Sequence, residues 1–371
     1  MQAPEPSGSS HAVARLAQRL REAASAASEA NLRVIALEVS RELEALGCAA
    51  PGGAVAASGV APDRRETADS GAVSPSLHCL RTLVGHKDCV HCIVPLSDSC
   101  VASGSDDGTI RLWDVASGRS RATLTGHGDT VFSITALGSD RLASASKDKT
   151  VKIWHAESGQ CLSTMQGHRR TVSCVIAIGC DSIVSGAFDR SLKVWDVGGA
   201  QCRATFEGHT DVVLCLADLG GGRLVSGSND KSLIVWESTS GLCLRRLQGH
   251  ERCVCSVAPL GPGRILSGSK DATLKIWDGG SGECLRTLEG HESYVRCVGT
   301  LLGSACIVSG SSDRTLRLWS AGSGRCILSC EGHGDSVSCV AVLTDCVATG
   351  SDDGTLKLWG LPGALEALCT S

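Results

Sequence analysis

Residues 249–278 read GHERCVCSVAPLGPGRILSGSKDATLKIWD, and the same pattern returns along most of the chain. The stretch holds three short runs rich in Val, Ile, Leu and Cys, which are separated by turns of Gly, Pro, Ser, Lys and Asp. A fourth run, 283–288, follows before the next Gly-His pair. Short runs of this kind, bounded by turn residues, are typical of β-strands. One repeat therefore predicts four short strands.

The Gly-His pair occurs seven times with a period near 41 residues, and a tryptophan follows each pair. The first such interval runs from His86 to Trp113 and the last from His333 to Trp359. All seven tryptophans of the chain belong to this pattern. A fixed period of this length indicates one supersecondary unit repeated in sequence. Seven units of four strands predict an all-β fold, a seven-bladed β-propeller.

These units resemble WD repeats, because Gly-His, Ser-Gly-Ser-x-Asp and Trp-Asp recur in register over residues 78–360. The sequences of these repeats are most similar to those of F-box/WD-repeat propellers. Residues 1–77, however, show no Leu-Pro-x-Glu motif that would begin an F-box. The Asp after Trp is replaced in four repeats. We expect this loss to leave the core intact, because the position ends a strand. The replacements are His155, Glu237, Ser320 and Gly360.

Each repeat also carries one His, one Ser or Thr, one Asp and one Trp at fixed positions. An indole N–H only donates hydrogen bonds and a carboxylate only accepts them, whereas Ser and His do both. The resemblance implies that the four side chains form a buried tetrad, with a structural role in place of catalysis or metal binding. The seven sets are His86/Ser103/Asp107/Trp113, His127/Ser144/Asp148/Trp154, His168/Ser185/Asp189/Trp195, His209/Ser226/Asp230/Trp236, His250/Ser267/Asp271/Trp277, His291/Ser309/Asp313/Trp319 and His333/Thr349/Asp353/Trp359.

The last repeat provides only three clear strands and needs a fourth. Residues 78–83, just before the first Gly-His, resemble the fourth strand 283–288 of another repeat. We expect 78–83 to complete the blade formed by 336–360, which would leave few open strand edges in the ring. Residues 361–371 then form a tail, whose part after Pro362-Gly363 resembles a frayed helical turn more than a strand.

Charge and the distribution of apolar residues argue against several classes of protein. The chain of 371 residues has a net charge of −4 and no Lys/Arg block, so nucleic acid is not favoured as its partner. No apolar run is long enough for a transmembrane helix. Residues 1–6 do not resemble a secretory signal. We therefore expect the protein in the cytoplasm, the nucleus or both.

Eleven of the 21 cysteines align with the repeat in two sets. One set lies seven residues before the Gly-His histidine, and a second set lies six residues after it. We predict buried small apolar side chains at these strand positions, in place of disulfides or zinc ligands. Cys89 and Cys92 have C-x-x-C spacing, but no second ligand pair follows at a matching distance. No metal and no cofactor are expected.

Residues 1–77 lie outside the repeats. Residues 1–10 are expected to be disordered, 11–47 to form an amphipathic helical segment and 48–77 to be a flexible linker. The helical segment carries apolar residues three or four positions apart, with a coiled-coil-like stripe over 32–46. Two interpretations stay open. The segment either docks on the propeller or stays loose, or it mediates self-association or partner binding.

The resemblance implies a binding rim built from residues three and five after the Gly-His histidine and from the residue before the turn Asp. Three of the chain's four Phe and Tyr residues fall on these positions, whereas Phe206 does not. Exposed aromatic and Arg side chains are frequent in binding hot spots. We expect an apolar patch across the second to fourth blades. The favoured rim residues are Phe132, Lys147, Phe188, Val212, Leu214, Asn229, Lys270, Tyr294 and Arg296.

These patterns favour a non-catalytic scaffold or adaptor that binds other proteins or peptides. Outside the tetrads, the four remaining histidines stand in no recognisable catalytic or metal-ligand arrangement. One alternative is the substrate receptor of a ubiquitin ligase, although the basic residues of the rim are dispersed. A second alternative is a G-protein β-like signalling subunit, although the long linker separates the helical segment from the first blade.

Overall fold

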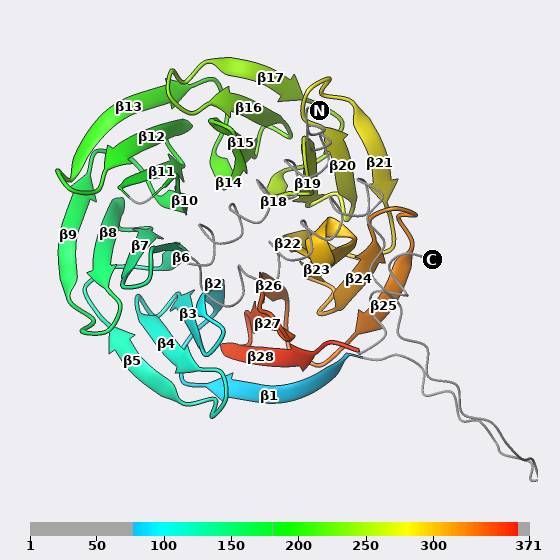
Figure 1. Ribbon diagram of the computed structural model, residues 1–371, viewed down its shortest axis with the longest axis horizontal. Helices are drawn as coiled ribbons and strands as arrows, with labels where there is room; N and C mark the ends of the chain where they lie inside the picture. The colour runs from blue at the N-terminus through cyan, green and yellow to red at the C-terminus, as the bar shows by residue number, and fades with distance from the viewer. Residues whose placement is uncertain (1–76, 180, 363–371) are drawn as a thin grey trace, which may run out of the picture. The chain divides into compact units, whose positions relative to one another are not determined.

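The computed structural model describes residues 77–179 and 181–362, and these residues form seven four-stranded antiparallel sheets arranged in a ring (Figure 1). The all-β, seven-bladed architecture predicted from the repeats is confirmed from residue 77 onward. The innermost strands of neighbouring blades contact one another around the ring, from β2 (Val90–Ser97) through β14 (Val213–Gly220) and back to β2. Within the described ranges, no helix is both long and apolar enough to cross a membrane.

Each of the first six blades is built from four consecutive strands. In the first three blades, β2 is followed by β3 (Cys100–Ser105), β4 (Ile110–Asp114), β5 (Ser120–Leu124), β6 (Val131–Leu137), β7 (Arg141–Ser146), β8 (Thr150–His155), β9 (Cys161–Gln166), β10 (Val172–Ala177), β11 (Ser182–Ala187), β12 (Ser191–Asp196) and β13 (Gln201–Glu207). In the next three, β14 is followed by β15 (Arg223–Ser228), β16 (Leu233–Glu237), β17 (Cys243–Leu247), β18 (Val254–Pro259), β19 (Arg264–Ser269), β20 (Leu274–Asp278), β21 (Cys284–Leu288), β22 (Val295–Leu301), the 3-10 turn η1 (Leu302–Ser304), β23 (Cys306–Ser311), β24 (Leu316–Ser320) and β25 (Cys326–Cys330).

The seventh blade joins two distant parts of the chain. Its inner strands are β26 (Val337–Val342), β27 (Cys346–Ser351) and β28 (Thr355–Gly360), and its outer strand is β1 (His78–Val84). β1 runs antiparallel to β28, with His78 opposite Gly360 and Leu83 opposite Leu356. Leu83 is fully buried in this blade, so β1 supplies core packing as well as backbone hydrogen bonds.

The hydrophobic core lies between adjacent blades. Ile110 of the first blade, for example, packs in one cluster with Val131, Leu142 and Trp154 of the second. All seven tryptophans are buried in clusters of this kind. Gly104 shows how closely the blades approach, because a Cβ added there would lie 2.7 Å from a methyl of Val131. Contacts this close couple the packing of each blade to that of its neighbour.

The four repeated polar side chains form one hydrogen-bonded chain in each blade. The Trp Nε1–H donates to the Ser Oγ at 2.7–2.8 Å, with Thr349 in the place of Ser in the last blade. The hydroxyl lies 2.6–2.8 Å from His Nε2. His Nδ1 lies 2.7–3.0 Å from the Asp Oδ2. The chain is complete when His is neutral and Asp is ionised, since every member then has a partner.

The hydroxyl and indole members of the tetrads are enclosed in the core, where at most 2% of each residue is exposed. A ligand at the surface of the ring cannot contact them, so they hold the fold together and form no part of a binding surface. The enclosed hydroxyl residues are Ser103, Ser144, Ser185, Ser226, Ser267, Ser309 and Thr349. The enclosed indoles are Trp113, Trp154, Trp195, Trp236, Trp277, Trp319 and Trp359.

The electrostatics favour ionised aspartate in every tetrad and neutral histidine in the first and last tetrads. Burial raises the pKa of Asp107, but hydrogen bonds from Thr109 and His86 outweigh it and leave the pKa at about 2. The pKa values of the other six tetrad aspartates are lowered in the same way. Burial also lowers the pKa of His86 and of His333. Neutral histidine beside ionised aspartate is the pairing that the hydrogen bonds require.

The two cysteine sets differ, and one of the two predictions is wrong. The set six residues after the Gly-His histidine is free and buried, as in Cys92 and Cys339, whose Sγ atoms approach Val carbonyl oxygens of the neighbouring blade. The set seven residues before the histidine was expected to be buried but lies on the outer strands, where one face meets solvent. Of this set, Cys79, Cys202, Cys243, Cys284 and Cys326 are exposed, and Cys161 is half-buried.

The segments predicted for residues 1–10, 11–47 and most of 48–77 lie outside the described residues, as does most of the tail 361–371. Leu77, expected as the last residue of the linker, is buried between blades, and its carbonyl oxygen lies 3.8 Å from the Cys330 Sγ. Leu361 packs against the same hydrophobic cluster.

Candidate functional site

A cavity of about 560 Å³ opens at the mouth of the central channel, and this mouth is the candidate site. Each blade contributes the residue five positions after its Gly-His histidine, because alternate residues of the innermost strands face the channel. Turn and loop residues complete the wall. The mouth is lined by His91, Phe132, Ser173, Phe188, Leu214, Cys255, Lys270, Tyr294, Arg296, Ser312 and Ser338.

One half of the mouth is apolar. Phe132, Phe188 and Leu214 come from the second, third and fourth blades, which are neighbours in the ring. All three are half-buried, so part of each side chain reaches the cavity. The His91 ring lies against Phe132 with centroids 5.0 Å apart, and this contact extends the aromatic surface to the first blade. The arrangement suits an apolar side chain of a ligand.

The other half of the mouth carries charge. Arg296 Nη1 lies 2.6 Å from Asp352 Oδ2, an ion pair between the sixth and seventh blades. Lys270 Nζ stands 5.7 Å from the centre of the Tyr294 ring, within the range of a cation–π interaction. Tyr294 itself is 40% exposed. This half offers cationic and hydroxyl groups for the polar parts of a ligand.

The structure divides the nine favoured rim residues into two groups. Those that line the mouth are Phe132, Phe188, Leu214, Lys270, Tyr294 and Arg296. Lys147, Val212 and Asn229 are not among the lining residues. Lys147 turns to Asp129, with Nζ 3.3 Å from Oδ1, and the Asn229 amide donates to Asp211 at 2.6 Å. The expected apolar patch is therefore formed without Val212.

Ser173, Cys255, Ser312 and Ser338 also line the mouth but were left out of the favoured set. They occupy the same repeat positions as the favoured residues. Small side chains give no sign in the sequence that they border a cavity. Their position in the repeat does place them on the predicted rim.

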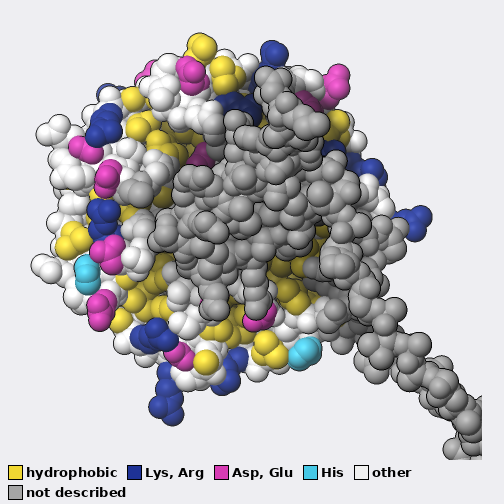
Figure 2. Space-filling model, viewed as in Figure 1, with side chains coloured by type: hydrophobic (Ala, Val, Ile, Leu, Met, Phe, Trp, Pro, Cys, Tyr) yellow, Lys and Arg dark blue, Asp and Glu magenta, His cyan; other side chains and the backbone are white. Residues whose placement is uncertain are grey.

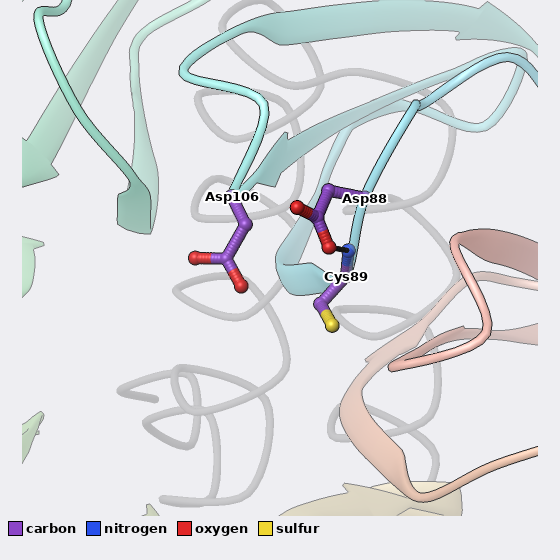
Figure 3. A group of neighbouring side chains, drawn as sticks. All are labelled: Asp88, Cys89 and Asp106. Atoms are coloured by element: carbon purple, nitrogen blue, oxygen red, sulfur yellow. Dashed lines mark hydrogen bonds between the residues drawn. The ribbon is translucent and has the colours of Figure 1, made fainter.

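Asp88, Cys89 and Asp106 form the one cluster of potential metal ligands found among the described residues, with ligand atoms within 4.8 Å of one another (Figure 3). Burial, with a contribution from Asp352, raises the pKa of the Cys89 thiol to about 11, so it is protonated at neutral pH. Asp106 Oδ1 accepts a hydrogen bond from Thr130, and its Oδ2 lies 2.9 Å from His91 Nε2. These contacts explain the cluster as a hydrogen-bonded junction between turns, and they do not favour a metal site.

The charged groups elsewhere on the ring are mixed in sign. Figure 2 shows Lys and Arg side chains interspersed with Asp and Glu around the margin of one face. Arg121 and Arg203 on outer strands pair with Asp114 and Asp196. Exposed pairs of this kind contribute little to stability.

Comparison with protein families identifies the repeat. The model of the WD domain, G-beta repeat, matches the chain seven times, at residues 77–114, 118–155, 159–196, 200–237, 241–278, 282–320 and 324–360. The chain belongs to the WD-repeat family. Propellers of this family commonly serve as protein-interaction scaffolds and are typically non-catalytic. The match gives no support to the F-box subtype, and a search of curated proteins gave no significant match.

Proposed function

We propose that this WD-repeat propeller is a non-catalytic scaffold or adaptor that binds a segment of another protein at the mouth of its channel. The placement of the rare aromatic residues carries the proposal. The chain has three Phe and one Tyr, and Phe132, Phe188 and Tyr294 all border the mouth. Phe206, the remaining one, is buried and stacks on Trp236. Aromatic side chains that line a cavity instead of a core are suited to anchoring a ligand.

An interaction experiment tests this role. The full chain and its Phe132→Ala/Phe188→Ala variant are used as baits, and bound proteins are quantified by mass spectrometry. Leu285→Ala is the matched control, because Leu285 is a 50% exposed apolar residue on the outer strand β21. Partners lost only by the mouth variant support the proposal, whereas partners retained equally by all three baits argue against it.

The ubiquitin-ligase and G-protein β-like alternatives have less support. A clamp for a phosphorylated peptide needs several convergent arginines. Among the residues that line the mouth, Arg296 is the single arginine, and Asp352 already engages it. The helical segment on which the G-protein comparison depends lies outside the described residues. The scaffold role is therefore the one that the mouth favours.

A further inference from the structure

Four basic residues occupy a backbone position that favours glycine. The turn between the second and third strands of each blade places one residue in the left-handed region. Gly108 and Gly354 hold this position in the first and seventh blades. In the second, third and fourth blades it holds Lys149, Arg190 and Lys231, with φ of 72°, 71° and 70°. Ala272 and Arg314 hold it in the fifth and sixth blades. Lysine and arginine adopt this conformation at an energetic disadvantage relative to glycine, so backbone preference does not explain their presence.

Lys149, Arg190 and Lys231 are neighbours in the ring and part of a larger group, which we call the basic arc. Its members are all exposed and lie in the loops beside the apolar half of the mouth. The Arg169 N–H donates to Asp189 Oδ2 at 2.8 Å, and the Phe188 N–H donates to the Thr171 carbonyl oxygen at 2.8 Å. Both bonds hold the third blade's loop and turn together on the side of the ring where Phe188 reaches the mouth. The basic arc consists of Lys147, Lys149, Arg169, Arg170, Arg190 and Lys231.

Acidic groups only partly offset the basic arc. Asp129 pairs with Lys147, and Asp211 is engaged by Asn229. The tetrad aspartates are common to all seven blades and so do not distinguish this side. The equivalent loops of the seventh and first blades are instead acidic. They carry Asp335, Asp352, Asp88 and Asp106, against the single exposed Lys87. The rim is therefore positive over the second to fourth blades and negative on the adjoining seventh and first blades.

We propose that the basic arc binds an acidic, Asp- and Glu-rich segment of a partner protein, next to an apolar anchor seated on Phe132 and Phe188. This inference rests on the proposed function, because it specifies the partner of the same mouth. The cations are spread over three blades and so match carboxylates distributed along an extended chain. Phosphate clamps use convergent arginines. A nucleic acid long enough to cross the ring would meet the acidic loops of the first and seventh blades.

Selection from a random peptide library on the full-length chain tests the inference. Peptides that combine an apolar residue with several Asp or Glu are expected to be enriched. A synthetic peptide from that selection is then measured by fluorescence anisotropy. The Lys149→Gly/Arg190→Gly/Lys231→Gly variant should bind it about tenfold more weakly, and rising salt should abolish the difference. Glycine suits the backbone at all three positions, so the variant is expected to remain folded.

A matched pair of single variants tests whether the effect depends on which blade carries the basic residue. Arg190→Gly should weaken binding, whereas Arg314→Gly, at the equivalent turn of the sixth blade with φ of 70°, should not. Apolar peptides without acidic enrichment, lost on Phe132→Ala/Phe188→Ala but not on the glycine variants, would overturn this inference and leave the proposed function standing. Peptides insensitive to both sets of variants would overturn the proposed function too. Equally tight binding of a single-stranded oligonucleotide or a phosphopeptide by the same arc would refute the choice of an acidic protein segment.

Discussion

The tetrads and the mouth use neighbouring positions of the same repeat but differ in their uniformity. Every blade has the same hydrogen-bonded chain from Trp to Asp, and only Thr349 departs from Ser. At the mouth, the equivalent position is His91, Phe132, Ser173, Leu214, Cys255, Arg296 or Ser338. The buried layer must meet one set of hydrogen-bonding requirements in every blade. The mouth has no such requirement, so its composition can follow a ligand. Four experiments test how sharply the two regions differ.

Removal of β1 should have the largest effect on stability, because the packing around the tetrads depends on a closed ring. Deletion of residues 1–84 exposes the edge of β28 and removes the buried Leu83. We expect the melting temperature to fall by roughly 10 °C or more. Deletion of residues 1–76 is the control, since it keeps β1. Equal melting temperatures for the two deletions would show that β1 does not close the ring in solution.

Truncation within the tetrad layer should come next. Trp277 is almost fully buried and donates to Ser267. Trp277→Ala leaves a cavity and an incomplete hydrogen-bonded chain, and we expect it to cost about 3–5 kcal/mol of unfolding free energy. Denaturant titration followed by circular dichroism measures this loss. If Trp277→Ala lowered the unfolding free energy less than a substitution at the mouth, the tetrads would not be the main source of stability.

Acid should weaken the tetrads with a defined pH dependence. Tetrad aspartates have pKa values below the ordinary 3.8, with those of Asp107 and Asp353 at about 2, so the folded state binds fewer protons than the unfolded state between these values. Stability should therefore fall as pH drops through this window. His86 and His333, whose pKa values lie below the ordinary 6.5, should start a gentler loss below pH 6.5.

Thermal melts from pH 7 to pH 2 measure this dependence. Asp107→Asn should start less stable and lose less stability on acidification than the unaltered chain. A melting temperature that stays constant down to pH 3 and below would contradict the prediction.

The smallest effect on stability, with the largest on binding, is expected at the mouth. Phe188 is half-buried, and Phe188→Ala should cost about 1–2 kcal/mol of unfolding free energy. The same change should weaken binding of a peptide selected on the full chain by about tenfold or more. Parallel measurement of melting and peptide affinity separates the two effects. If Phe188→Ala lowered the melting temperature but left the peptide affinity unchanged, Phe188 would serve the packing of the loops and not binding.

The sequence could predict the blades because each unit repeats both its hydrophobic pattern and its polar set. Position in the repeat also grouped the residues that surround the channel. It could not determine which way an individual side chain turns. Lys147 and Asn229 occupy rim positions, but Asp129 and Asp211 engage them away from the mouth. Such turns of a side chain depend on local partners that a periodic pattern does not encode. The error over the cysteines has another cause, because Cys92 lies on an inner strand and Cys284 on an outer strand of its blade, and the two repeat positions were treated alike.

The pairing of β1 with β28 also determines how the ring responds to mechanical force. The chain enters β1 at His78 and leaves β28 at Gly360, and these two residues are opposite each other. A pull applied between residues 77 and 361 loads this one pair first and then peels the strands apart pair by pair. If the two strands were pulled from opposite ends instead, all of the hydrogen bonds between them would share the force. The propeller should therefore open readily under tension between these two points.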